Sequence, residues 1–210
     1  MKRILSLDLF DIQSQLTDEE RMGRDAVARF VDAEVLPVIT QHFRDGTFPD
    51  ALVPKLASLG MLGANLTGYG CAGMSATGYG VCLMELERGD SGIRSFASVQ
   101  GSLAMFPIWS WGSDAQKDTW LPKMSSGKAI GCFGLTEADH GSDPGGMKTR
   151  AIPQADGGWL LKGNKRWITN GTVADVAVVW AKTGEGADSV RGFLVEKGTP
   201  GFVQLSLIHI

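Results

Sequence analysis

The stretch GCFGLTEADHGSD, residues 131–143, divides the sequence into two parts of different character. It begins as an alternating, strand-like run and continues as a polar loop that holds carboxylates, a histidine, a glycine and a serine. Before it, apolar residues recur at helical spacing. After it, short β-type runs follow one another. We therefore predict an α+β multidomain chain, with a helical part followed by a β part.

Two capping boxes mark the beginnings of predicted helices in the first part. Thr17 with Glu20, and Ser113 with Gln116, have the spacing at which a hydroxyl and a carboxyl or carboxamide satisfy free amides of the first turn. Apolar periodicity predicts further helices through residues 52–59, 79–86 and 95–107. Residues 1–128 are accordingly predicted to form an N-terminal all-helical domain.

The second part reads as a sheet. The runs AIGCFGLT, WLLKG, RWITN, DVAVVWAK and RGFLVEK are each bounded by Gly, Asn, Asp or Pro, and Asp156 with Gly157 forms a turn pair. Since no helical pattern separates the runs, a mainly antiparallel sheet or barrel is expected over residues 129–203. The end, QLSLIHI, residues 204–210, continues no pattern and reads as a non-matching tail at a cut in the chain.

Composition narrows the class of protein. The net charge of −3 disfavours a nucleic-acid partner. The sequence has no apolar run of the roughly 18–20 residues that a membrane span needs, and its start carries acids where a signal peptide is apolar, so a cytoplasmic location is expected. Cys71, Cys82 and Cys132 lack metal-ligand or redox spacing and are expected to be part-buried thiols.

Two segments could bind a ligand. In the loop 131–143, Gly141 would let backbone amides approach a phosphate or a polar cofactor edge, with Thr136 and Ser142 as hydroxyl partners. The alternative is an ordinary hairpin loop. In KRWITNG, residues 165–171, Trp167 and Thr169 on a strand would place an indole and a hydroxyl on one side, as a platform for a flat ring. The alternative there is a core tryptophan beside a β-forming threonine.

The segments GCFGLTEADHGSDP and WITNG together resemble the flavin-binding signature of the acyl-CoA dehydrogenase family, and a helical start before a β domain is that family's order. The segments GYGCAG, ELERGDSG, RSFASVQGSL and GCFGLTE are similar to the glutaryl-CoA dehydrogenase branch. The resemblance runs from about residue 16 to residue 202. It implies FAD as the cofactor, and a C-terminal four-helix domain that lies outside these 210 residues.

The resemblance also implies site residues. Residues expected to bind FAD are Phe133, Leu135, Thr136, Gly141, Ser142, Trp167, Ile168 and Thr169. Arg94 and Ser95 match the pair that meets the distal carboxylate of the substrate in glutaryl-specific members, and Ser142 is expected near the substrate as well. Glu137 is expected to order the loop. Asp139 and His140 are assigned no role, and Glu85 with Glu87 is expected to lie on a solvated helix face.

The implied reaction is α,β-dehydrogenation of an acyl-CoA. In the glutaryl-specific branch, which serves lysine and tryptophan degradation, glutaryl-CoA loses carbon dioxide and becomes crotonyl-CoA. Electrons pass to an electron-transferring flavoprotein, and relatives are usually homotetramers. The catalytic glutamate is expected in the C-terminal domain, so these 210 residues are expected to contain no catalytic base and to be inactive alone.

Three points stay open. The substrate could be another acyl-CoA, handled by a dehydrogenase or an oxidase. The chain could instead be a non-catalytic interaction module that holds no flavin. The sequence also departs from the family pattern at Ala138, where a proline is usual, and after Phe202.

Overall fold

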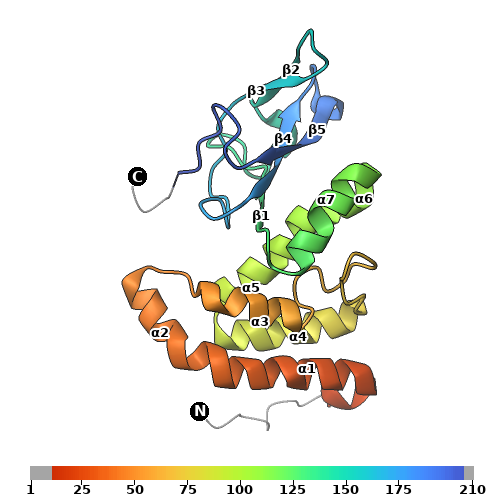
Figure 1. Ribbon diagram of the computed structural model, residues 1–210, viewed down its shortest axis with the longest axis vertical. Coiled ribbons are helices and arrows are strands. Elements are labelled where there is room, and N and C mark those ends of the chain that lie inside the picture. The colour runs from red at the N-terminus through yellow and green to blue at the C-terminus, as the bar shows by residue number, and fades with distance from the viewer. Residues whose placement is uncertain (1–10, 206–210) are drawn as a thin grey trace.

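A computed structural model describes residues 11–205 of the chain. Helices form one part of the molecule and a sheet the other, and β1 leads from the last helix into the sheet (Figure 1). The start of the chain, which the sequence analysis compared with a signal peptide, lies largely within residues 1–10. Most of the predicted non-matching tail lies within residues 206–210. Both lie outside the described residues.

The first predicted helix is confirmed and is longer than one α-helix. After the short 3-10 turn η2 (Ile12–Gln15), α1 (Asp18–Phe30) begins at a complete capping box of Thr17 and Glu20. A π-helical turn, η3 (Val31–Val35), joins it to α2 (Leu36–Asp45). Gly46 ends α2 with a φ of 62°, a conformation that glycine adopts without steric cost.

The remaining helices follow the predicted order. They are η4 (Asp50–Leu52), α3 (Val53–Ser58), α4 (Ala76–Gly89), α5 (Ser91–Ser98), the π-helix η5 (Val99–Met105), α6 (Phe106–Trp111) and α7 (Asp114–Ser125). Ser75 and Asp90 cap α4 and α5, and the predicted capping box of Ser113 and Gln116 begins α7. The predicted helix over residues 95–107 is therefore three consecutive segments with a π-helix in the middle.

The sheet has five strands: β1 (Gly131–Gly134), β2 (Arg150–Pro153), β3 (Trp159–Lys162), β4 (Val176–Lys182) and β5 (Val190–Glu196). Antiparallel pairs join β2 to β3 and β4 to β5. Pairing is parallel between β1 and β4, and β2 meets β4 in parallel at the single pair Arg150–Lys182. The sheet is thus mainly antiparallel, as predicted. Its parallel pairs were not predicted, because the crossover from β1 to β4 is made by a hairpin and loops rather than by a helix.

One predicted strand is wrong. The segment RWITN is a loop, in which Trp167 has a φ of 58° and Asn170 a φ of 64°. These left-handed conformations cannot continue an extended strand. The amide of Ala174 donates to the carbonyl of Asn170 at 2.9 Å, which closes a turn before β4. The strand β2, conversely, was not predicted from the sequence.

Three clusters of buried side chains support the chain. One lies within the helices and includes Val31, Leu56, Leu86 and Phe96, and another lies within the sheet around Cys132 and Ala177. The cluster between them, which we call the joint cluster, contains Leu66, Ala104, Met105, Ile108, Leu121, Met124, Ala129, Val176 and Val178. Helices and strands therefore share a core rather than meeting only through a linker.

Close backbone approach completes this junction. A Cβ on Gly131 would lie 2.5 Å from both the Cβ of Ala104 and the Cε of Met124, so only glycine allows β1 to pack so tightly against η5 and α7. The carboxamide of Gln100, which is fully buried, accepts from the amide of Gly131 at 2.7 Å. It also donates to the carbonyls of Met124 and Ala129 at 3.1 and 2.8 Å.

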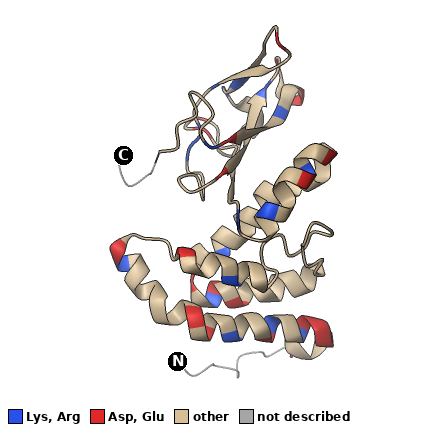
Figure 2. Cartoon of the chain, viewed as in Figure 1, with Lys and Arg blue, Asp and Glu red and all other residues tan. Residues whose placement is uncertain are grey.

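Charged residues of both signs alternate along the helices, most visibly on α1 (Figure 2). Across residues 11–205, none of the helices combines the length and the apolar character that crossing a bilayer requires. Cys71, Cys82 and Cys132 are free thiols, and burial raises the pKa of Cys82 and Cys132 to about 11.

Candidate functional site

A pocket of about 140 Å³ lies where the helical part meets two loops of the sheet. Val99 and Leu103 line it from the π-helix η5. The other lining residues are Phe133, Thr136, Trp167, Ile168 and Thr169. The two segments singled out in the sequence thus face one shared pocket, although about 30 positions separate them in the chain.

A backbone hydrogen bond joins these two segments directly. The amide of Arg166 donates to the carbonyl of Thr136 at 2.8 Å. Trp167 follows with its left-handed backbone, and its side chain is 66% exposed. A bulky residue in this conformation is a strained outlier of the kind that collects at functional sites. The guanidinium of Arg166 covers the Trp167 ring at 5.1 Å from its centre.

Glu137, directly after Thr136, is buried and fully engaged in ordering the loop, as predicted. Its carboxylate accepts from the amides of Lys148 and Thr149, from the Thr149 hydroxyl and from the Lys165 ammonium. Burial alone would raise the pKa of Glu137. The hydrogen bonds from Lys165, Thr149 and the two amides outweigh burial and lower the pKa to about 2.

The other residues expected to bind FAD, Leu135, Gly141 and Ser142, are not in the pocket lining. The carbonyl of Leu135 accepts from Lys165 Nζ at 3.0 Å. Gly141 and Ser142 are exposed on the outer part of the loop, and a Cβ on Gly141 would have no atom within 4 Å. Open space at Gly141 agrees with a backbone that a ligand could approach.

Arg94 and Ser95 lie on α5, before the π-helix. Arg94 Nε donates to Glu87 Oε2 at 2.6 Å, and Arg94 Nη1 donates to Ser98 Oγ at 3.4 Å. Because a guanidinium has five N–H donors, these bonds leave donors for a second carboxylate. Ser95 lies one helical turn before Val99, so α5 leads from Arg94 and Ser95 to the pocket.

Sequence reasoning missed Val99 and Leu103. Both read as ordinary core positions of a helix, and the run RSFASVQGSL was used only for its resemblance. Both residues belong to the π-helix η5, a form of helix that is frequent at functional sites.

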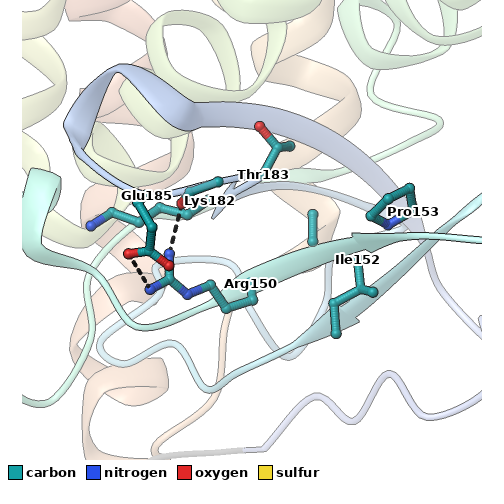
Figure 3. A pocket seen from close by; sticks show the side chains of 8 residues that line it. Arg150, Ile152, Pro153, Lys182, Thr183 and Glu185 are labelled. Atoms are coloured by element: carbon teal, nitrogen blue, oxygen red, sulfur yellow. Dashed lines mark hydrogen bonds and ion pairs between the residues drawn. The ribbon is translucent and has the colours of Figure 1, made fainter.

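A second hollow, of about 250 Å³, opens where β2 and β4 diverge (Figure 3). Arg150 Nη1 donates there to the carbonyl of Gly184 at 2.8 Å, and Arg150 Nη2 lies 3.4 Å from Glu185 Oε2. Its lining, Arg150–Pro153 and residues 182–185, includes none of the predicted site residues. Since Glu185 already compensates Arg150, the first pocket is the better candidate site.

Two family models match the chain. The model described as acyl-CoA dehydrogenase, N-terminal domain, matches residues 17–128, and the model described as acyl-CoA dehydrogenase, middle domain, matches residues 132–207. The first match alone covers more than half of the chain.

Two solved structures are similar to this chain over nearly its whole length. A glutaryl-CoA dehydrogenase from Mycobacterium smegmatis is 58% identical with a TM-score of 0.88, over 93% of this chain and 50% of that one. A structure of a glutaryl-CoA dehydrogenase from the same organism in complex with FADH2 is 52% identical with a TM-score of 0.90, over 94% of this chain and 50% of that one.

A curated relative, the short-chain specific acyl-CoA dehydrogenase of Megasphaera elsdenii, is 34% identical over 204 residues, which are 94% of this chain and 51% of the relative. This chain thus spans about half the length of the relatives named here. With both family models matched in order, and with the two signature segments facing one pocket, the chain belongs to the acyl-CoA dehydrogenase family.

Proposed function

We propose that this chain supplies the FAD pocket and part of the acyl-CoA site of an acyl-CoA dehydrogenase. The observation that carries the proposal is the pocket in which Phe133 and Thr136 face Trp167, Ile168 and Thr169 across η5. Bound FAD would accept the hydride from the β carbon of the acyl chain. The residues of this chain would hold the flat ring, exclude water from one side of it and bond its polar edge.

The pocket fits one end of such a cofactor. Apolar side chains of Val99, Leu103, Phe133 and Ile168 supply its walls, and the hydroxyls of Thr136 and Thr169 supply hydrogen-bonding groups for a ring edge. Pockets that enclose a drug-sized ligand have volumes of roughly 300–1,000 Å³. A volume of about 140 Å³ therefore accommodates part of FAD, with the exposed Trp167 indole available for stacking outside it.

The pocket lining contains no carboxylate that could remove the α proton, and the acid beside it, Glu137, is unsuited to that role. A general base works best with a pKa near the operating pH. The pKa of Glu137 is about 2, and four donors already occupy its oxygens. We therefore expect this chain alone to bind ligands without oxidising an acyl-CoA.

Glutaryl-CoA is the substrate that we favour. Arg94, whose side chain is 34% exposed on α5 just before η5, offers a guanidinium for a distal carboxylate. The 58% identity to a glutaryl-CoA dehydrogenase supports this choice. The alternative is a short acyl-CoA without a distal carboxylate, which the 34% identity to a short-chain specific enzyme supports. We further propose an electron-transferring flavoprotein as the electron acceptor and a homo-oligomer as the working form.

A titration of the purified chain with FAD tests the cofactor proposal. We expect saturable quenching of flavin fluorescence together with a shift of the visible absorption bands. Thr169→Val removes a hydroxyl of the pocket and should weaken binding about fivefold, the effect of one lost neutral hydrogen bond. Thr199→Val is the control, since the Thr199 hydroxyl bonds the carbonyl of Glu196 away from the pocket. A flavin spectrum that stays that of free FAD at every protein concentration would contradict the proposal and favour an interaction module.

A further inference from the structure

A buried ion pair lies next to the pocket lining in the sequence: Glu137 follows Thr136, and Lys165 precedes Trp167 by two residues. Lys165 Nζ is 2.8 Å from Glu137 Oε1, and the side chains of Lys165 and Glu137 are only 11% and 6% exposed. The ion pairs of Lys148 with Asp139 and of Arg150 with Glu185, by contrast, lie at the surface. Burial makes the Lys165–Glu137 pair costly, because both charges lose hydration. Stabilisation of the fold therefore does not explain the Lys165–Glu137 pair, and its contacts indicate a different role.

The contacts of the pair connect three stretches of chain. Lys165 Nζ also donates to the carbonyl of Leu135 at 3.0 Å. On the other side, Glu137 accepts from the amides of Lys148 and Thr149 at 2.7 and 3.0 Å, which attaches the residues before β2. The pair therefore holds the loop after β1, the start of β2 and the segment before Trp167 at one point.

The pocket residues lie next to these contacts. Leu135 and Glu137 are the two neighbours of Thr136, and both are bonded by Lys165. Arg166, which follows Lys165 and precedes Trp167, donates its amide to the carbonyl of Thr136 at 2.8 Å. Bonds at both neighbours of Thr136, together with the bond from the Arg166 amide just before Trp167, thus fix Thr136 and Trp167 relative to one another.

Packing leaves this arrangement little freedom. The stem of Lys165 passes Gly134, where a Cβ would lie 3.5 Å from Lys165 Cγ. A Cβ on Gly163 would collide with Oγ1, Cβ and Cα of Thr149, so the segment entering Lys165 runs tightly against the residue that bonds Glu137. Side chains held in this way keep a site in one geometry before any ligand arrives.

We propose that Lys165 and Glu137 are positioning residues, which preorganise the pocket by fixing Thr136 against Trp167. Neither side chain lines the pocket, so both act through the residues beside them. The inference rests on the proposed function where it concerns FAD. Its geometric part, the fixing of Thr136 against Trp167, stands without a ligand.

The test uses the whole chain in two measurements. In the first, without FAD, amide hydrogen exchange compares the wild type with Lys165→Met and with Glu137→Gln, a variant of nearly unchanged shape. The amide of Arg166 should exchange at least tenfold faster in both variants, while the amides of α1 and α7 keep their wild-type rates. Lys148→Met is the matched control, since it removes a lysine from the exposed pair with Asp139 and should leave the Arg166 amide within twofold of the wild type.

The second measurement is FAD affinity. Both variants should bind FAD at least tenfold more weakly than the wild type, and the double variant Lys165→Met with Glu137→Gln should regain stability to urea but not FAD affinity. Unchanged exchange at Arg166 in both single variants would overturn the inference, as would wild-type FAD affinity in the double variant. If the wild type binds no FAD, the proposed function fails, and the exchange measurement still decides the positioning role.

Discussion

Gln100 Oε1 accepts a hydrogen bond from the backbone amide of Gly131 at 2.7 Å, so a side chain of the helical part is bonded to the first residue of the sheet. The same carboxamide donates to the carbonyls of Met124 and Ala129. Gln100 belongs to the π-helix that also supplies Val99 to the pocket. One turn of helix therefore both joins the two parts of the chain and forms one wall of the candidate site.

Gln100→Leu should destabilise the chain. The variant keeps the apolar bulk but leaves the Gly131 amide and the Ala129 carbonyl without the bond from Gln100, at a cost of about 1–3 kcal/mol. The Met124 carbonyl keeps the bond from the Gly127 amide. Urea denaturation followed by circular dichroism measures this change in the free energy of unfolding. Gln154→Leu is the control, since that exposed amide bonds only nearby carbonyls, and its effect should stay within about 0.5 kcal/mol. Equal effects of the two variants would mean that Gln100 does not hold the junction.

Two glycines of β1 should differ sharply in their tolerance of alanine. In Gly131→Ala the new Cβ would lie 2.5 Å from Ala104 Cβ and Met124 Cε, and overpacking of this kind costs roughly 1–3 kcal/mol. In Gly134→Ala the nearest atoms lie at 3.5 Å, an ordinary contact. Thermal unfolding of the two variants compares them directly. If Gly134→Ala is the more destabilised, β1 does not pack against η5 and α7 as described.

The parts of the fold that the sequence predicted are those with local causes. The capping box of Thr17 and Glu20 depends only on hydrogen bonds within one helical turn. The turn at Asp156 and Gly157 likewise depends only on neighbouring residues. The parallel pairing of β1 with β4 depends on partners more than 40 residues apart, and short β-type runs do not encode strand order. The π-helix η5 was not predicted because Phe96, Val99 and Leu103 have spacings of three and four residues, which an ordinary α-helix also explains.

Five of the eight residues predicted to bind FAD line the pocket, but the reasoning from residue types placed two of them on a strand that does not form. Trp167 and Thr169 were expected on one side of a strand, and both do line the pocket, but from a loop with a left-handed residue at Trp167. Alternation of residue types in RWITN cannot show that the Arg166 amide bonds Thr136 instead of a neighbouring strand. Tertiary contacts decide the conformation there.

Acid should remove the contribution that the ionised Glu137 carboxylate makes to the free energy of unfolding. The folded pKa of Glu137, about 2, lies below its ordinary value of 4.5, so its stabilising contribution is fully present above pH 4.5 and is lost as the pH falls through 2. The difference in unfolding free energy between the wild type and Glu137→Gln should be constant near neutral pH. Below pH 4.5 it should shrink with a slope of up to about 1.4 kcal/mol per pH unit. A difference that is the same at pH 3 and pH 7 would contradict the proposed state of Glu137.

Arg94 should discriminate between acyl-CoA ligands. With FAD present, Arg94→Gln should weaken glutaryl-CoA binding roughly 10- to 100-fold, the range for hydrogen bonds between charged groups, and leave butyryl-CoA nearly unaffected. Isothermal titration calorimetry gives both affinities. Arg88→Gln serves as the control, because Arg88 is also paired with a carboxylate but lies on α4 and bonds Glu85 and Asp32. Equal losses for the two ligands with Arg94→Gln would leave the short acyl-CoA as the better substrate.

The most direct test of the central claim is the FAD affinity of Trp167→Ala beside that of Trp159→Ala. Both indoles are exposed, at 66% and 47%, but only Trp167 lines the pocket, while Trp159 packs edge-on against Phe193 in the sheet. Loss of a stacking ring costs about 1.4 kcal/mol or more, so Trp167→Ala should bind FAD at least tenfold more weakly and Trp159→Ala should bind it as the wild type does. Equal FAD affinity in the two variants would contradict the placement of the flavin at this pocket.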